Sequence, residues 1–523
     1  MMRFDAYRLV GPLVLLGLML APLTVRAQRA SDHVTEEKVE AAWIQLEALI
    51  TEEMQKTGVP GIAIGIVYRD KPIYLKGYGV RDVGTSYPVD ADTVFQLASL
   101  SKPLGSTVIA GLVSDGVVKW DDPIIKYDPG FEMDNPYLTR NVTIRDMYSH
   151  RSGLHYHAGD LLEDMGYDRA GVLYRLRFVP TGNRFRSQYA YTNFGVTEGG
   201  VAAAKAAGKT WEEISEERLY KPLGMNSTSS RLSDFLAQPN RARGHVLIDG
   251  KWQAKYQREP DAQSPAGGAS SSARDMAQWM SLHLGGGKVD GKQIIAADAL
   301  AETYRPQMVS NPARDPAIDR TGFYGLGWGV GYDELGRVKL SHSGAFDLGA
   351  ATTVYLLPSE QLGIVILTNA APIGVAEALA QSFLDLATYG ELKRDWVKLY
   401  KQGFAVLTTA GRSPIDYSKA PAQPVPGLAN DGYVGTYHND FFGEVEIVAK
   451  DGELVMQQGP RKTPFSLKHY NRNVFFYETA GENTVGLTGV TFTIGTDGKA
   501  TTMTVENLNS EGLGTFTRVP DKK

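Results

Sequence analysis

The chain has 523 residues, with 54 Lys and Arg against 59 Asp and Glu, and its net charge is −5. Hydrophobic residues make up 43% and charged residues 22%, ordinary values for a folded protein that exclude disordered, collagen-like and coiled-coil classes. The acidic balance argues against a general nucleic-acid binder. The absence of cysteine excludes disulfides, a thiolate nucleophile and a thiolate metal site.

The first residues have the layout of an export signal. Arg3 and Arg8 precede an uncharged run over 9–23, and Val25-Arg26-Ala27 supplies a small-residue cleavage pattern. The run is shorter than the roughly 20 residues that span a bilayer. We therefore predict a signal peptide over residues 1–27 and a mature chain that is periplasmic or secreted, with no stable membrane span.

Sheet strands are predicted at both ends of a region that is mostly helical in its middle. An amphipathic helix over 36–55 precedes an apolar hairpin over 61–78, and helical signals dominate from 91 to 286. A β meander follows and ends in a helix over 375–387. Because the strands come from distant sequence, we predict a mixed α/β (α+β) fold, with one antiparallel sheet flanked by helices and a helical subdomain. The meander strands are expected at 325–331, 338–343, 351–357 and 363–368.

The last part of the chain differs in character from the rest. Prolines cluster over 414–426, and turn signals at 430–432, 450–452 and 496–498 then alternate with short apolar runs. This pattern is typical of antiparallel strands joined by tight turns, so we predict a small all-β barrel. The expected division is a first domain over 31–405, a Pro-rich linker over 406–427 and the barrel over 428–523.

One segment offers a serine nucleophile. Ser99-Leu100-Ser101-Lys102 is the only Ser-x-x-Lys sequence in the chain. If a helix begins at Ser99, the side chains of Ser99 and Lys102 lie one turn apart on one face. A serine hydroxyl needs a base to take its proton, and a lysine can be that base when burial lowers its pKa. By itself the motif is also typical of a helix start with a capping serine and a surface lysine.

Two further segments supply side chains for the same chemistry. In Tyr191-Thr192-Asn193 the tyrosine, if it lies beside a lysine ammonium, could lose its proton, act as general base and then return the proton to the leaving group. The asparagine could hold the lysine and a substrate amide. His342-Ser343-Gly344 ends a predicted strand, whose edge could supply a backbone N–H to an oxyanion hole, while Gly344 lets substrate approach. We assign the similar sequences Lys56-Thr57-Gly58 and Tyr437-His438-Asn439 to a helix end and to a strand and turn.

Taken in order, the Ser-x-x-Lys, Tyr-x-Asn and His-Ser-Gly motifs resemble those of the serine β-lactamase and penicillin-binding-protein superfamily. The nearest branch is that of the class C β-lactamases with their esterase and peptidase relatives. The likeness covers about residues 36–395 and the final region, from 432–437 onward, resembles the lipocalin-like module of some of these hydrolases. The resemblance implies a β-lactamase/transpeptidase-like domain followed by a lipocalin-like barrel. Segments that also agree are 142–154, 221–225, and 265–268 with Asp275.

The resemblance also implies roles for individual residues. Ser99 would be the acylated nucleophile, with Lys102 and Tyr191 as the acid–base pair. The backbone N–H groups of Ser99 and Ala345 would form the oxyanion hole, and no metal or cofactor is implied. The residues implied in substrate binding are Asn193, His342, Ser343, Gly344 and Ala345.

The third motif departs from the β-lactamase pattern. His342 stands where β-lactamases usually carry the lysine of Lys-Thr-Gly, whose cation helps to bind the substrate carboxylate. A histidine is usually neutral near pH 7, which argues against efficient β-lactam hydrolysis. The motif resembles instead the esterase, D-aminopeptidase and other peptidase branches.

Other candidate side chains are assigned less directly. His155 and His157 could line the cleft or belong to a loop, and His150 is expected to be a structural hydrogen-bonding residue within its turn. An arginine group could bind a substrate carboxylate or lie at the surface: Arg151, Arg184 and Arg186.

The sequence therefore predicts an exported serine hydrolase that cleaves an ester or peptide-type amide of a small molecule or short peptide through an acyl-enzyme. The alternatives are a β-lactamase or D-Ala-D-Ala carboxypeptidase, and a non-catalytic sensor with a penicillin-binding fold. We expect no nucleic-acid partner. A homo-oligomer is left open, and so is the role of the barrel.

Overall fold

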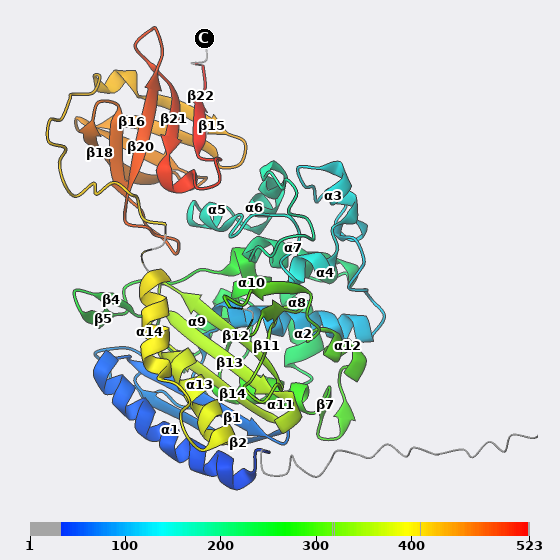
Figure 1. The fold of residues 1–523 in the computed structure, drawn as a ribbon. Coiled ribbons are helices and arrows are strands. Elements are labelled where there is room, and N and C mark those ends of the chain that lie inside the picture. The colour runs from blue at the N-terminus through cyan, green and yellow to red at the C-terminus, as the bar shows by residue number, and fades with distance from the viewer. Residues whose placement is uncertain (1–32, 316, 318, 408, 410, 521–523) are drawn as a thin grey trace, which may run out of the picture.

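The computed structural model describes residues 33–520 except 316, 318, 408 and 410. The larger part is a sheet with helices on both faces and a helical portion beside it, and the smaller part is a closed barrel (Figure 1). This architecture confirms the predicted mixed α/β fold with a C-terminal all-β barrel. The signal peptide expected over 1–27 lies outside the described residues.

The central sheet has eight antiparallel strands in the order β2-β1-β14-β13-β12-β11-β10-β9. The first hairpin pairs with the last strand of the domain, so that Ile64 of β1 lies opposite Ile366 of β14. The helical part is therefore inserted between strands of one sheet, as the sequence predicts. The strands are β1 (Gly61–Tyr68), β2 (Lys71–Gly79), β9 (Met308–Asn311), β10 (Gly322–Tyr324), β11 (Gly329–Tyr332), β12 (Val338–Phe346), β13 (Ala350–Leu357) and β14 (Leu362–Thr368).

Two hydrophobic layers form on opposite faces of this sheet, because side chains alternate along each strand. Ile62, Ile64 and Ile66 of β1 pack with α1 (Glu36–Thr57) and α13 (Val375–Tyr389). Ala63 and Val67 of the same strand belong to the core on the other face, where α2 (Ser101–Ser114) and α11 (Ala273–Leu284) lie. Burial on both faces explains the unbroken apolar run of β1.

The helix α2 runs through the centre of the domain. Every residue of α2 from Ser101 to Leu112 is buried, so the core anchors the turn that precedes the helix. This turn carries Ser99. The remaining helices are α3 (Pro136–Asn141), α4 (Ile144–Tyr148), α5 (Asp160–Asp164), α6 (Arg169–Arg175), α7 (Asn193–Ala206), α8 (Trp211–Ser215), α9 (Leu232–Ala237), α10 (Ser264–Gly267), α12 (Ala297–Glu302) and α14 (Trp396–Leu407).

The C-terminal part is a closed barrel of eight antiparallel strands. The turn signal at 450–452 joins two of them, with Asp451 and Gly452 at positive φ angles of 53° and 85°. Two consecutive residues at positive φ are what a tight hairpin needs. The strands are β15 (Gly435–Asn439), β16 (Gly443–Lys450), β17 (Glu453–Gln458), β18 (Thr463–Asn471), β19 (Val474–Glu478), β20 (Leu487–Ile494), β21 (Ala500–Val505) and β22 (Thr515–Arg518).

Two predicted strands of the meander were wrong in extent. The segment 325–331 is not one strand, because a turn closed by the Gly325 N–H and the Trp328 carbonyl separates β10 from β11. Gly327 adopts a φ of +78° in that turn, and an added Cβ would meet the Lys102 carbonyl at 2.7 Å. The strand expected to end at 343 continues to Phe346, so the His-Ser-Gly motif lies inside β12.

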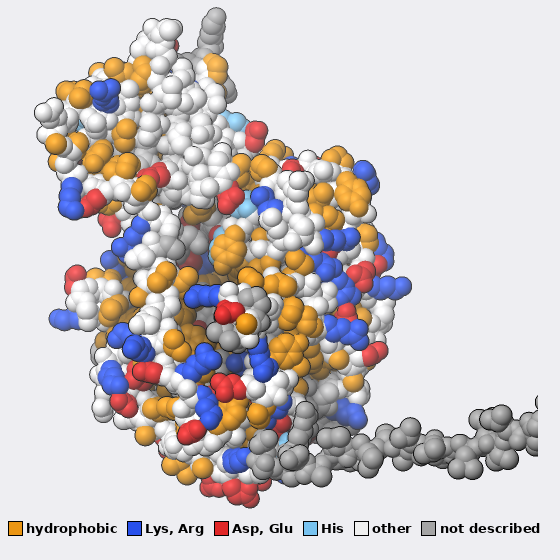
Figure 2. Space-filling model, in the orientation of Figure 1, with side chains coloured by type: hydrophobic (Ala, Val, Ile, Leu, Met, Phe, Trp, Pro, Cys, Tyr) orange, Lys and Arg blue, Asp and Glu red, His pale blue; other side chains and the backbone are white. Residues whose placement is uncertain are grey.

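The surface carries charges of both signs. Figure 2 shows Lys and Arg side chains interspersed with Asp and Glu over the visible face of the larger part, with the barrel as a separate lobe beside it. This mixture agrees with the small net charge of −5. Within the described ranges, the helices are all too short or too polar to cross a membrane.

Candidate active site

The structure brings Ser99, Lys102, Tyr191 and Asn193 together in one cluster. Ser99 lies in a 3-10 turn (Ala98–Leu100) directly before α2, and Ala98 adopts a φ of 49° in the left-handed region. A non-glycine residue rarely takes this conformation, which the buried surroundings of Ala98 must therefore hold. The Ser99 hydroxyl lies 3.0 Å from Lys102 Nζ and 2.8 Å from the Tyr191 hydroxyl.

Lys102 is completely buried. Its ammonium has three hydrogen-bond partners: Ser99 Oγ at 3.0 Å, Asn193 Oδ1 at 2.7 Å and the Ala266 carbonyl at 3.1 Å. Burial lowers the pKa of Lys102 to about 7, although the negative charge of Asp160 acts in the opposite direction. A large fraction of Lys102 is therefore neutral near pH 7 and able to accept the proton of Ser99.

Tyr191 donates its hydroxyl hydrogen to Ser99 Oγ, and Lys102 Nζ lies 4.5 Å from the centre of the Tyr191 ring. Burial raises the pKa of Tyr191 well above its usual value, so the phenol is protonated near neutral pH. Of the predicted acid–base pair, Lys102 is therefore the better proton acceptor and Tyr191 the better proton donor.

His150 supports the tyrosine segment. Its Nδ1 accepts a hydrogen bond of 3.1 Å from the Thr192 N–H, and its carbonyl accepts one of 2.9 Å from the Ala190 N–H. Its ring lies 4.4 Å from that of Tyr191, centre to centre. The histidine is a structural residue, as predicted, but the segment that it holds carries Tyr191 as well as its own turn.

Asn193 is oriented by a residue that the sequence motifs do not identify. Its Nδ2 donates to Asp160 Oδ2 at 2.9 Å, while its Oδ1 accepts from Lys102. The same Asp160 oxygen lies 2.5 Å from Nδ1 of His157. A buried carboxylate thus fixes which end of the asparagine amide faces the lysine.

Strand β12 passes directly beside the serine. A Cβ at Gly344 would lie 2.3 Å from the Leu97 carbonyl and 2.9 Å from the Ser99 nitrogen, so only glycine allows this approach. The prediction gave substrate approach as the reason for glycine here, whereas the structure gives contact with the serine's own segment. Ala345 is the next residue of the strand, which keeps its backbone beside the Ser99 turn.

The two side chains of the third motif face opposite ways. Nε2 of His342 lies 2.9 Å from the Tyr324 hydroxyl, and its Nδ1 lies 2.7 Å from the Ser343 carbonyl. The Ser343 hydroxyl contacts Thr353 Oγ1 at 3.1 Å and the carboxyl of Glu377, on the α13 side of the sheet. Any part of Ser343 in substrate binding would therefore fall to its backbone.

His342 is uncharged in this environment. Burial, together with the nearby charge of Lys102, lowers the pKa of His342 to about 3. The third motif thus presents a neutral imidazole where a lysine would present a cation. This agrees with the expectation drawn from the sequence.

The arginine group does not line the cleft as a free carboxylate binder. Arg151 and Arg186 both pair with the buried carboxylate of Asp146, each at 2.7 Å. Arg184 donates to the carbonyls of Gly153 and Pro180. The group is structural.

The two sequences that are similar to the motifs lie away from this cluster. Lys56-Thr57-Gly58 ends α1 with Gly58 as its cap, and Tyr437-His438-Asn439 lies in β15.

Comparison with known proteins identifies the family. The Beta-lactamase family model matches residues 46–387, and a model described as "Domain of unknown function (DUF3471)" matches residues 419–515. The chain therefore belongs to the Beta-lactamase family, and its closed barrel fits the lipocalin-like module expected from the sequence.

Several curated proteins are similar along much of their length. The unguisins hydrolase ungD of Aspergillus violaceofuscus (strain CBS 115571) is 26% identical over 445 residues, covering 78% of this chain and 77% of that protein. The D-alanyl-D-alanine-carboxypeptidase/endopeptidase AmpH of Escherichia coli (strain K12) is 23% identical over 342 residues, covering 64% of this chain and 85% of its own.

A solved structure shares the fold. The octameric penicillin-binding protein homologue from Pyrococcus abyssi superposes with a TM-score of 0.59 at 18% sequence identity. The alignment covers 88% of this chain and 97% of that one.

Proposed function

We propose that the protein is a serine hydrolase that cleaves an ester or peptide-type amide through an acyl-enzyme on Ser99. The observation that carries the proposal is the contact of one serine hydroxyl with both a buried lysine of lowered pKa and a protonated tyrosine. The nucleophile is then within hydrogen-bond distance of both a base and an acid.

In the acylation step, Ser99 Oγ attacks the substrate carbonyl carbon and its proton passes to Lys102 Nζ. The carbonyl oxygen takes up the negative charge beside the N–H groups of Ser99 and Ala345. Tyr191 gives its proton to the leaving group and regains one from Lys102. The bond to the leaving group breaks, and an ester to Ser99 is left. Water then attacks the carbonyl carbon of this ester, and its proton passes by way of Tyr191 and Lys102 to Ser99 Oγ. The ester bond breaks, the acid product leaves and the Ser99 hydroxyl is restored.

Rapid mixing with a p-nitrophenyl ester tests the proposal. We expect a burst of about one p-nitrophenolate per chain followed by slower turnover, together with an acyl mass on the peptide that contains Ser99 in acid-quenched samples. Slow linear release at the same rate in wild type and Ser99→Ala, without any acyl adduct, would contradict it and favour the non-catalytic sensor.

The substrate preference follows from the neutral third motif. His342 offers no cation to a substrate carboxylate, and a charged hydrogen bond contributes about 1.5–3 kcal/mol. We expect uncharged p-nitrophenyl esters and short peptide amides to be cleaved with a kcat/KM about 100-fold above that of nitrocefin, measured side by side. Nitrocefin turnover at the same level would assign the protein to the β-lactamases.

A cell-wall D,D-peptidase is the second candidate, because AmpH, a similar protein, is named as a D-alanyl-D-alanine carboxypeptidase/endopeptidase. Release of D-Ala from a cell-wall pentapeptide would support it. The similar unguisins hydrolase is consistent with hydrolase chemistry in general.

Removing the Tyr191 hydroxyl tests its role as the acid. We expect Tyr191→Phe to lower kcat about 10²–10⁴-fold for a peptide amide, and far less for a p-nitrophenyl ester, because p-nitrophenolate leaves without a proton. The matched control is Tyr189→Phe, whose ring packs beside His150 and Tyr324 in the same cluster. Equal losses for amide and ester would argue that Tyr191 serves another step.

Export and assembly belong to the same proposal. We expect the chain to be found in a periplasm or outside the cell, cut near Ala27, which N-terminal sequencing of the secreted protein would test. A homologue of the same fold is described as octameric, which supports testing for a homo-oligomer by light scattering.

A further inference from the structure

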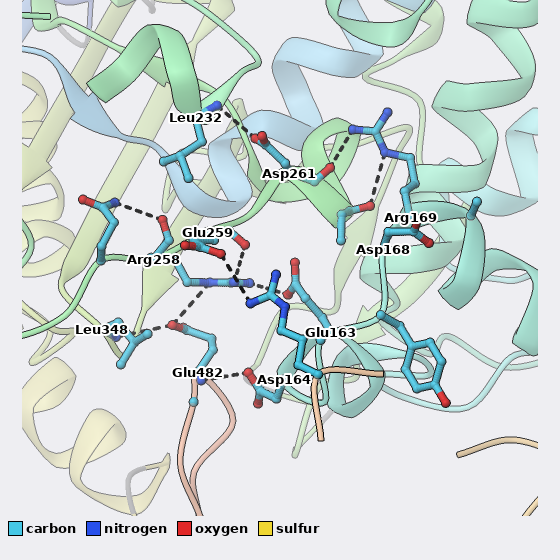
Figure 3. Close-up of a pocket in the computed structure, with 17 residues that line it drawn as sticks. Glu163, Asp164, Asp168, Arg169, Leu232, Arg258, Glu259, Asp261, Leu348 and Glu482 are labelled. Atoms are coloured by element: carbon cyan, nitrogen blue, oxygen red, sulfur yellow. Dashed lines mark hydrogen bonds and ion pairs between the residues drawn. The ribbon is translucent and has the colours of Figure 1, made fainter. Parts of the chain in front are cut away.

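A loop of the barrel reaches the hydrolase domain next to α5. The loop, residues 479–486, joins β19 to β20. The backbone N–H groups of Glu482 and Asn483 donate to the two carboxylate oxygens of Asp164, each at 2.9 Å, and Nδ2 of Asn483 adds a third bond of 2.9 Å. In Figure 3 a dashed line joins the Glu482 nitrogen to the Asp164 carboxylate. The barrel loop thus donates three hydrogen bonds to the Asp164 carboxylate.

The same loop also contacts the turn that follows β12. The Glu482 carboxylate accepts the N–H groups of Asp347 at 2.7 Å and Leu348 at 3.4 Å, in the turn that follows β12. It also lies 3.5 Å from Nε of Arg258 (Figure 3), whose carbonyl accepts a bond of 3.1 Å from Gln96. Loop 479–486 therefore bridges α5 on one side and the end of the β12 strand on the other.

The helix α5 connects the loop to the chemistry. Asp164 is its last residue and Asp160 its first, so the two carboxylates lie about one turn apart on a single short helix. The Asp160 carboxylate accepts a hydrogen bond from Asn193 Nδ2, and the Asp160 carbonyl accepts one of 3.4 Å from Asn483 Nδ2. A displacement of α5 would move the partner that sets the direction of the Asn193 amide.

We propose that Asp160 and Asp164 are positioning residues for acyl transfer. Loop 479–486 of the barrel binds Asp164 and so holds α5 in place. Through α5 it keeps Asp160 against Asn193, and Asp160 in turn keeps Asn193 Oδ1 against Lys102. The proposal rests on the function assigned to Ser99 and Lys102 above. The barrel would then help to hold the active-site residues in position.

The charges around the lysine support this role. The titratable groups near Lys102 are Asp160, Tyr191, His150 and His342, and Asp160 is also paired with His157. Burial lowers the pKa of His150 and of His342 and raises that of Tyr191, so these three groups are neutral near pH 7. Asp160 is then the anion that favours the protonated lysine, so its distance from Lys102 affects the proportion of free base.

The first experiment separates the barrel contact from general destabilisation. Asp164→Ala removes three hydrogen bonds to the loop, whereas the control Asp168→Ala removes only the cap that α6 receives at the Gly171 N–H. We expect Asp164→Ala to lower the acylation rate about tenfold with KM almost unchanged, and to speed amide exchange in residues 157–164 and 189–194. Asp164→Asn, which keeps one acceptor oxygen, should restore part of both.

The second experiment uses the charge of Asp160. Asp160→Asn keeps an oxygen for Asn193 but removes the anion that favours protonated Lys102. The pKa of Lys102 should therefore fall, and the acidic limb of the pH profile of kcat/KM should move to lower pH by about half a unit. Asp160→Ala, which also removes the acceptor, should lower kcat about 100-fold. A structural defect alone would not move the limb.

The outcomes distinguish this proposal from the assigned function. Exchange at 189–194 and acylation in Asp164→Ala that match Asp168→Ala would overturn the coupling, as would an unmoved limb in Asp160→Asn. If wild-type protein shows no Ser99 adduct, the assigned function fails, and the exchange measurement still decides whether the barrel loop reaches the Asn193 segment.

Discussion

Ser99→Ala is expected to abolish the burst and to lower kcat/KM for a p-nitrophenyl ester by about 10⁴–10⁶-fold. The variant removes the oxygen that lies 3.0 Å from Lys102 Nζ and 2.8 Å from the Tyr191 hydroxyl, which is the proposed acceptor of the acyl group. The lysine, the tyrosine and the oxyanion site would remain, which leaves only weak residual catalysis. Stopped-flow absorbance and the mass of acid-quenched protein measure both parts of the expectation.

Ser101→Ala is the matched control, because Ser101 belongs to the same motif but faces another way. Its hydroxyl donates to the Ala98 carbonyl at 2.7 Å and accepts from the Ala269 N–H at 2.9 Å. Loss of these buried bonds should cost about 1–3 kcal/mol of stability, with the burst retained in the folded fraction. A burst that survives in Ser99→Ala, or that disappears only in Ser101→Ala, would show that the nucleophile is misassigned.

The motif residues could be predicted because residues of suitable chemistry occur at short, recognisable spacings in the sequence. Ser99 and Lys102 are three residues apart at the start of one helix, and Tyr191 and Asn193 flank the start of another. The helix spacing alone places the first pair in contact. Spacing alone could not show that this pair contacts Tyr191 and Asn193. The order of the motifs, which resembles that of a known family, predicted that contact.

The supporting residues could not be predicted in this way. Asp160 and Tyr324 contact the motif residues only because distant segments fold together, and neither carries a distinctive local pattern. His150 was predicted to be a structural residue of its own turn, but its partner, the Thr192 N–H, belongs to a distant segment. The C-terminal end of β12 was misjudged for the same reason, since pairing with β13 extends the strand to Phe346. Likewise, nothing in the Glu482-Asn483 dipeptide indicates that a barrel turn would bond to α5.

Lys102→Met is expected to lower kcat/KM for the ester about 10³–10⁴-fold and to remove the pH dependence near neutrality. In wild-type protein the lysine is active only when unprotonated, so with its pKa lowered to about 7, kcat/KM should rise as pH increases through 7. Methionine fills a similar volume but accepts no proton, so the remaining activity should lack this limb. A pH profile of kcat/KM from pH 5 to 9 measures the difference.

The stability of the same variant provides an independent test of the lowered pKa. Between pH 7 and 10 the unfolded chain binds a proton at Lys102 that the folded protein does not, so wild-type unfolding free energy gains about 1 kcal/mol per pH unit from this group. Lys102→Met lacks that gain, and its stability relative to wild type should therefore fall as pH rises from 7 to 10. Lys339→Met is the control, because burial also lowers the pKa of Lys339, on the α13 side of the sheet near Gln381. It should retain the burst and the acidic limb near pH 7. A limb that persists in Lys102→Met would mean that another group, with Tyr191 the nearest, takes the serine proton.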